Sequence, residues 1–168
     1  MTTLNIRPNK SGLEAMTQLM NGVYNSASLM DYCVDQFGKH ASLYVGFDPN
    51  NPPKDDKIPW IGCTMGSMGL ADGYTHFEYS ISIGAALSAS TSTTTDATNG
   101  IISYDSVDIA DEFARLLIEA VNNAMIQTDE QNNLEILTIS QAQILTNLPH
   151  ISIYFNMTIG VDLETNLD

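Results

Sequence analysis

Near the start of the chain, apolar side chains recur at the spacing of a helix. Ser11 followed by Glu14 has the form of a capping box, in which the serine oxygen accepts from a helix amide and the glutamate bonds back to the cap. From there apolar residues recur at steps of three and four until Gly38, a helix-stop signal. They are Leu13, Met16, Met20, Val23, Ala27, Met30, Val34 and Phe37. We expect this stripe to pack on the domain's own sheet, with a two-chain coiled coil as the alternative, and Gly22 leaves open a kink or two shorter helices.

The chain then changes to the alternating pattern of strands. Residues 42–47 and 58–65 are strand-like, and the proline-bearing segment between them, 48–57, is expected to be a solvated loop. A glycine-rich turn is predicted at 66–73. In the next strand, 75–87, one face is apolar and the other polar, which is typical of a sheet with one buried and one wet face. The apolar face carries Phe77, Tyr79, Ile81, Ile83, Ala85 and Leu87, and the polar face carries His76, Glu78, Ser80 and Ser82.

The second half of the chain predicts a loop, a helix and two strands. Residues 88–100 hold no apolar residue larger than alanine, so they cannot offset the entropy of ordering, and we expect a mobile loop. A helical stripe begins at Val107, with acidic residues in its first turn where the helix dipole favours them. Residues 134–146 and 150–163 have the pattern of long strands, and 164–168 is expected to be a frayed tail.

This order of elements predicts an α+β fold. Close connections between successive strands favour antiparallel pairing over right-handed crossovers. We expect a mainly antiparallel sheet with two principal helices packed on it, in the order helix, three strands, helix, two strands. No internal repeat or linker divides the sequence, so residues 1–168 are predicted to form a single domain.

Charge adds to this picture by excluding classes of partner. Six Lys and Arg residues stand against 20 Asp and Glu, a formal net charge of -14, which opposes general attraction to nucleic acid or to anionic lipid. After Lys57, Arg115 is the only basic residue. The sequence has no apolar run long enough for a membrane span and no signal-peptide pattern at its start. We therefore expect a protein of the reducing cytosol with no membrane partner.

Candidate catalytic and metal-binding patterns are weak. Gly62, Gly66 and Gly69 lack the Lys-Ser/Thr pair of a phosphate-binding P-loop, and a plain turn is favoured. Cys63 could act as a nucleophile with His76 as its base, but a buried structural cysteine is the favoured interpretation. No histidine or acidic spacing matches a zinc or calcium motif. We expect no enzymatic activity, no catalytic residue, no metal and no cofactor.

Three segments, together with the element order, carry a resemblance to a known family. They are the IPWIG segment at 58–62, the helix SVDIADEFARLLIEAVNNA and the ending LPHISIYFNMTIGVDL. Together they resemble the tail-terminator (tail-completion) proteins of long-tailed bacteriophages. The resemblance implies a structural virion protein that forms a hexameric ring, caps the tail tube, ends tube polymerisation and joins the tail to the head connector. It also implies assembly in the host cytoplasm and a final place in the virion tail.

The same resemblance implies partners, and it suggests which residues face them. The partners would be further copies of the chain, the tail tube protein and a head-side connector protein, with DNA passing through without specific binding. Carboxylates that face such a bore would repel phosphate. From their place in predicted loops or on polar faces, the candidate DNA-passage acids are Asp72, Glu78, Asp96, Asp129 and Glu130. The candidate assembly-loop residues, which a neighbouring subunit would order, are Ser88, Thr93, Thr94, Thr95 and Asn99.

A different class of function fits the same acidic composition. A free acidic protein could act as a DNA mimic, binding and inhibiting a nucleic-acid-binding partner by imitating phosphate charge. Oligomeric mass discriminates between the two hypotheses, because a monomer or dimer favours the mimic and a ring favours the terminator.

Overall fold

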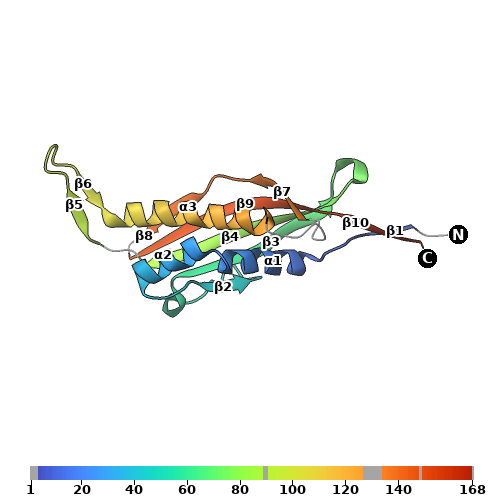
Figure 1. The fold of residues 1–168 in the computed structure, drawn as a ribbon, viewed down its shortest axis with the longest axis horizontal. Coiled ribbons are helices and arrows are strands. Elements are labelled where there is room, and N and C mark those ends of the chain that lie inside the picture. The colour runs from blue at the N-terminus through green and yellow to red at the C-terminus, as the bar shows by residue number, and fades with distance from the viewer. Residues whose placement is uncertain (1–3, 89–90, 127–133, 148, 168) are drawn as a thin grey trace.

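The protein is an elongated body of helices on a sheet, with a strand pair extending from each end (Figure 1). The computed structural model describes residues 4–88, 91–126, 134–147 and 149–167. Within these residues, three α-helices lie on one face of a mainly antiparallel sheet. The predicted α+β class is confirmed.

The first predicted helix is in fact two helices. α1 (Gly12–Tyr24) begins at Ser11, where the capping box forms: the Glu14 amide donates to Ser11 Oγ at 3.2 Å, and the Ser11 amide donates to Glu14 Oε2 at 2.7 Å. After a short break, α2 (Ala27–Phe37) continues to Gly38, whose φ of 74° provides the left-handed cap. The third helix, α3 (Asp105–Ile126), is long and unbroken, and it packs against both α1 and α2.

The buried face of the first helical region matches the predicted stripe only in part, since Met16, Met20, Val23 and Met30 of the stripe are buried. Leu13 and Val34 belong to that stripe and are exposed, whereas Ala15, Leu19 and Cys33 lie outside it and are buried. The reason is that α1 packs on α3 and on the sheet at once, so a wider arc of its surface is covered than a single stripe provides. The stripe is interrupted where α1 gives way to α2.

The main sheet has the strand order β2-β3-β4-β9-β7, and β8 also pairs with β9. The parallel pair is β2 with β3; the other pairs are antiparallel. The long central strands β4 and β9 pair over twelve residues each, and their helix-facing side chains form the core with the three helices. The elements of the body are β2 (Ser42–Val45), β3 (Trp60–Leu70), β4 (Phe77–Ser88), α3 (Asp105–Ile126), β7 (Leu134–Ile139), β8 (Gln143–Asn147) and β9 (His150–Val161), with short 3-10 turns at Asp55–Lys57 and Asp72–Tyr74.

Two predicted strand boundaries were wrong. The segment 66–73 is not simply a turn, because β3 continues to Leu70 with a register irregularity between Met65 and Ser67. Pairing with β4 outweighs the weak strand propensity of its glycines. The predicted long strand 134–146 divides into β7 and β8, because the Ser140 side chain there accepts from the backbone of β9.

The predicted loop and the predicted tail both contain strands. Within 88–100, β5 (Thr93–Thr95) pairs with β6 (Ile102–Tyr104), so the apolar residues that support β5 come from beyond the segment's end. Residues 89–90 lie outside the described part of the chain. Residues 164–167 of the predicted tail instead belong to β10 (Leu163–Leu167), which pairs antiparallel with β1 (Leu4–Pro8) from the other end of the chain, and Asp168 lies outside the described residues.

Candidate functional site

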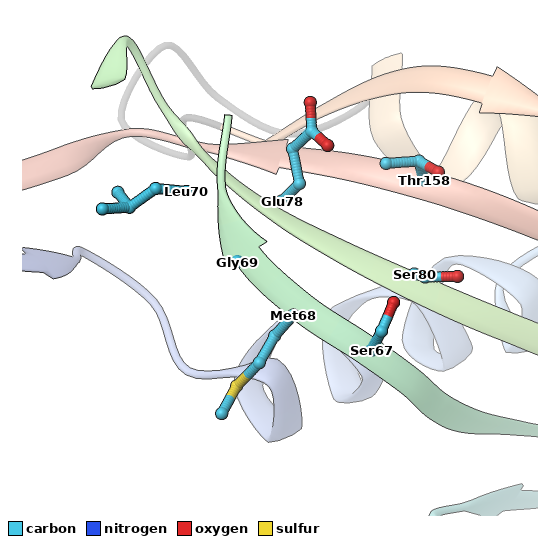
Figure 2. Close-up of a pocket in the computed structure, with 7 residues that line it drawn as sticks. All are labelled: Ser67, Met68, Gly69, Leu70, Glu78, Ser80 and Thr158. Carbon is cyan, nitrogen blue, oxygen red and sulfur yellow. The ribbon is translucent and has the colours of Figure 1, made fainter. Parts of the chain in front are cut away.

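The face of the sheet opposite the helices is lined by short polar side chains. Ser80 and Ser82 of β4 lie beside Asn156 and Thr158 of β9, and Ser82 Oγ donates to Asn156 Oδ1 at 2.7 Å. We call this surface the open face. At one end it forms a shallow groove of about 430 Å³ (Figure 2). The groove is lined by Ser67, Met68, Gly69, Leu70, Glu78, Ser80 and Thr158, although the side chains of Met68 and Leu70 point away from the Glu78 carboxylate.

The polar side-chain atoms that line this groove are all oxygens. Figure 2 shows the Glu78 carboxylate standing over the strands, with the hydroxyls of Ser67 and Ser80 below it. Glu78 Oε1 lies 3.1 Å from Nε2 of His76, the nearest side-chain base. A surface of hydroxyls with one carboxylate can repel an anion or form hydrogen bonds, but it offers no cationic group to hold a phosphate.

The other end of the open face is covered by aromatic side chains. Phe47 lies across Gly62 and Gly84, so closely that a Cβ on Gly62 would be 2.7 Å from its ring. Trp60 packs beside Phe47 with ring centroids 5.4 Å apart. The glycines let the Phe47 ring lie directly on the sheet at this end of the open face.

The strand pair β5–β6, with the turn between its strands, forms an arm at the end of the molecule where α3 begins (Figure 1). Cross-strand pairing places Thr93 opposite Tyr104 and Thr95 opposite Ile102, so these four side chains share one face. Ile102 is 62% exposed and Tyr104 is 49% exposed. On the other face, Thr94 donates to Asp105 at 3.0 Å. The arm therefore has an uncovered apolar face and a polar face tied to the start of α3.

The arm contains four of the five predicted assembly residues. Thr93, Thr94 and Thr95 form β5, and Asn99 lies in the turn, where its side chain accepts from the Ile101 amide at 2.9 Å. Ser88 ends β4 in the body, opposite His150, and is not part of the arm. Sequence reasoning missed the apolar residues Ile101, Ile102 and Tyr104, although Asn99–Gly100 is a hairpin-turn signal that could have revealed them.

The three predicted DNA-passage acids that lie in the described residues do not form one cluster. Asp72 begins the short turn between β3 and β4, and Glu78 lies near it on the open face. Asp96 lies instead in the turn of the arm, at the opposite end of the molecule (Figure 1). Its carboxylate accepts from the Thr98 amide at 2.7 Å, and this bond holds the pKa of Asp96 below its ordinary value. The remaining two, Asp129 and Glu130, lie outside the described residues.

Arg115 is the only Lys or Arg after Lys57, and it forms ion pairs with two glutamates of its own helix. Arg115 of α3 binds Glu112 at 2.6 Å and Glu119 at 3.2 Å. The hydrogen bond to Glu112 raises the pKa of Arg115 and the same contact lowers the pKa of Glu112. The i, i+3 and i, i+4 spacing in the sequence is the signal for these pairs. The exposed face of α3 is therefore not a basic docking surface.

The candidate nucleophile Cys63 and its candidate base His76 do not lie together in the structure. Cys63 lies in the core, where its thiol contacts the Met16 carbonyl at 3.9 Å, and burial raises its pKa to about 12. His76 lies on the other side of the sheet beside Glu78. Cys33 is also buried, and its pKa is raised to about 11. Neither thiol has the exposed, low-pKa character of a nucleophile.

The described residues contain neither a cluster of metal ligands nor a helix suited to a membrane. The described ranges bring together no group of three or more His, Cys, Asp or Glu side chains able to hold a metal ion. None of the helices in this part of the chain has the length and apolar character needed to cross a membrane. Protein-family models and curated proteins were both compared with the sequence, and neither comparison found a match.

Proposed function

We propose that this protein is a ring-forming structural protein of a bacteriophage tail, which caps the tail tube and ends its polymerisation. The observation that carries the proposal is the arm. Ile102 and Tyr104 hold a large apolar area in solvent at the end of a hairpin with only three residue pairs. An isolated two-stranded hairpin is marginally stable in water, so this element gains most from a neighbouring subunit.

The charge distribution supports a ring through which DNA passes. A net charge of -14 disfavours adhesion of DNA phosphates to any wall that the protein provides. Of the candidate bore-facing acids, Glu78 is the best supported, because its carboxylate stands over the uncovered, oxygen-lined groove. Asp96 is less well supported because its carboxylate holds the turn of the arm.

The resemblance found in the sequence supplies the remaining parts of the proposal. It gives six copies in the ring, the tail tube protein on one side and the head-side connector on the other. The structure is compatible with this assignment in its order of a helical region, three body strands, a long helix and a closing set of strands. DNA would pass through the ring without specific binding.

Oligomeric mass with and without the tail tube protein tests the proposal. We expect a monomer or a weak oligomer alone, and a sixfold ring on tube ends, measured by native mass spectrometry and electron microscopy. An exclusive dimer in both conditions would remove the terminator assignment. A stable monomer or dimer that binds a DNA-binding protein would support the DNA mimic instead.

Reversal of one charge tests the repulsive bore separately. Glu78→Lys should allow tails to assemble but slow DNA ejection at low salt, because a lysine in the bore makes a phosphate contact that added salt weakens. Asp35→Lys, on the outer surface of α2, is the matched control and should leave ejection unchanged. Unchanged ejection in Glu78→Lys at low salt would show that this acid does not face the bore.

A further inference from the structure

A second surface of the molecule is also left without a partner within the described chain. Strand β2 pairs with β3 only from Trp60 to Cys63. Beyond that point, at residues 64–70, β3 pairs with β4 on one side, and among the described residues no strand pairs with its other edge. The backbone of this open edge can accept a further strand.

The side chains along this open edge are apolar and uncovered. Pairing with Ile81, Tyr79 and Phe77 places Met65, Met68 and Leu70 on the helix side of the sheet. The helix layer stops short of them, because α1 begins at Gly12 against Met65. Their exposed fractions are 40% for Met65, 65% for Met68 and 42% for Leu70.

Leu13 follows Gly12, which lies against Met65, at the start of α1. Gly22 faces α3, since a Cβ on it would lie 2.1 Å from the Cβ of Ala124. Leu13 precedes Gly22 by nine residues, which at about 100° per residue is half a turn, so it lies on the side of α1 away from α3. It is 61% exposed. We call the four residues Leu13, Met65, Met68 and Leu70 the ledge.

We propose that the ledge and the open edge of β3 receive the arm of a second copy of this chain. This inference rests on the proposed function, because it specifies how neighbouring subunits of the ring are joined. The arm lies at one end of the molecule and the outer end of β3 at the other, so one chain cannot bring them together (Figure 1). A head-to-tail joint between two different surfaces is the kind of contact that closes into a ring.

The lack of charge on both surfaces lets two strongly acidic copies of this chain meet here. Two chains of net charge -14 repel each other over most of their surface. The apolar face of the arm consists of Thr93, Thr95, Ile102 and Tyr104, and none of these residues carries a charge. The four ledge residues are equally uncharged. Contact between arm and ledge therefore buries apolar area without burying a charged side chain, while backbone groups of the two open edges can pair.

Paired variants of the full chain test this joint. The arm variant is Ile102→Asp with Tyr104→Asp, and the ledge variant is Met68→Asp with Leu70→Asp. The matched control, Ile144→Asp with Leu145→Asp, adds the same two charges on exposed residues of β8. Each of the first two variants should weaken assembly on tube ends at least about tenfold, and the control should assemble like the wild type.

Mixing the two defective variants gives the sharper readout. The arm variant keeps its ledge and the ledge variant keeps its arm, so one joint can still form between them. At a concentration at which the wild type associates, the mixture should give one-to-one dimers in native mass spectrometry, whereas neither variant should dimerise alone. A mixture without dimers at that concentration would overturn the inference. Homodimers of either variant, or rings from either variant, would overturn the inference.

Cross-linking provides a test that needs no assembly defect. Tyr104→Cys in one copy and Met68→Cys in another should be joined by a short bismaleimide, while Cys33 and Cys63 are buried and remain unmodified. The same pairing of Tyr104→Cys with Leu145→Cys should give no product. If wild-type rings form but the arm and ledge cysteines do not cross-link, the joint is wrong and the proposed function stands. If the wild type forms no ring on tubes, the proposed function itself fails.

Discussion

Strands β4 and β6 carry the same residue types at the same spacing in opposite environments. In β4, Tyr79 and Ile81 lie two residues apart on one face and are 2% and 0% exposed. In β6, Ile102 and Tyr104 also lie two residues apart on one face, and both are largely exposed. The Tyr79 hydroxyl donates to the Lys10 carbonyl at 2.8 Å. Alternation thus determines which side chains share a face, but the rest of the chain determines whether that face is covered.

This difference distinguishes two parts of the molecule: a body whose core apolar side chains are covered by the chain itself, and an arm whose apolar side chains are not. β4 lies between two long neighbours under a layer of helices, whereas β6 has one short partner. Burial of apolar area is the main stabilising contribution in the body, and the arm lacks it. The following predictions test this division.

The largest expected difference is in hydrogen exchange of the free subunit. Amides of β4 and β9 that are bonded within the sheet should exchange only through global unfolding, at least about a thousandfold more slowly than those of β5 and β6. The arm amides should become protected on assembly. Mass spectrometry of exchanged peptides measures both. Equal, strong protection of the arm in the free and assembled protein would contradict the division.

Truncation of one side chain in each region should separate them by stability. Phe113 of α3 is fully buried, so Phe113→Ala should lower the free energy of unfolding by about 3 to 5 kcal/mol. Ile102→Ala in the arm should change it by less than about 0.5 kcal/mol, because no described side chain covers that position. Urea denaturation of the monomer measures both. A comparable loss in the two variants would show that the arm belongs to the folding unit.

The body was more predictable from the sequence than the arm and the terminal strands, because its signals are local. The capping box at Ser11 and the apolar face of residues 77–87 depend on neighbouring residues, and both are present as predicted. The pairing of β1 with β10, in contrast, joins residues that are far apart in the sequence. Arg7 meets Glu164 at a separation of 157 residues, and no local pattern indicates that pairing.

The arm was missed for a different reason. The segment 88–100 has no apolar residue larger than alanine, and this predicts a mobile loop. In the structure, however, β5 pairs with Ile102 and Tyr104, which lie just beyond Gly100. The exposed ledge could not be predicted either, because the exposure of Met68 depends on how far the helix layer reaches in three dimensions. A periodic pattern does not contain that information.

A smaller effect is expected when a glycine of α1 or of β3 is replaced by alanine. Gly22→Ala should destabilise the body by about 1 to 3 kcal/mol, because the new methyl would lie 2.1 Å from the Ala124 Cβ between α1 and α3. Gly69→Ala on the open face is the matched control and should be nearly neutral, since a Cβ there meets no atom within 4 Å. Thermal unfolding distinguishes them. An unaltered midpoint in Gly22→Ala would mean that α1 and α3 can separate at little cost.

The smallest effect is expected at the exposed cap of α1. Ser11→Ala should lower the free energy of unfolding by about 1 kcal/mol, because it removes the acceptor for the Glu14 amide. The Ser11 amide also donates to the Glu14 carboxylate, and this bond lowers the pKa of Glu14 below its ordinary value of 4.5. A lowered folded pKa means that the ionised form is favoured by folding. Its contribution is therefore present above pH 4.5 and is lost as the pH falls through the folded pKa.

Glu14→Gln isolates this pH dependence, because glutamine keeps the reach of the capping box without a titrating group. The wild type should be more stable than Glu14→Gln at pH 7, and the difference should shrink below pH 4.5, as urea denaturation across that range would measure. A difference that stays constant from pH 7 down to pH 3 would show that the carboxylate contributes through packing and not through its charge.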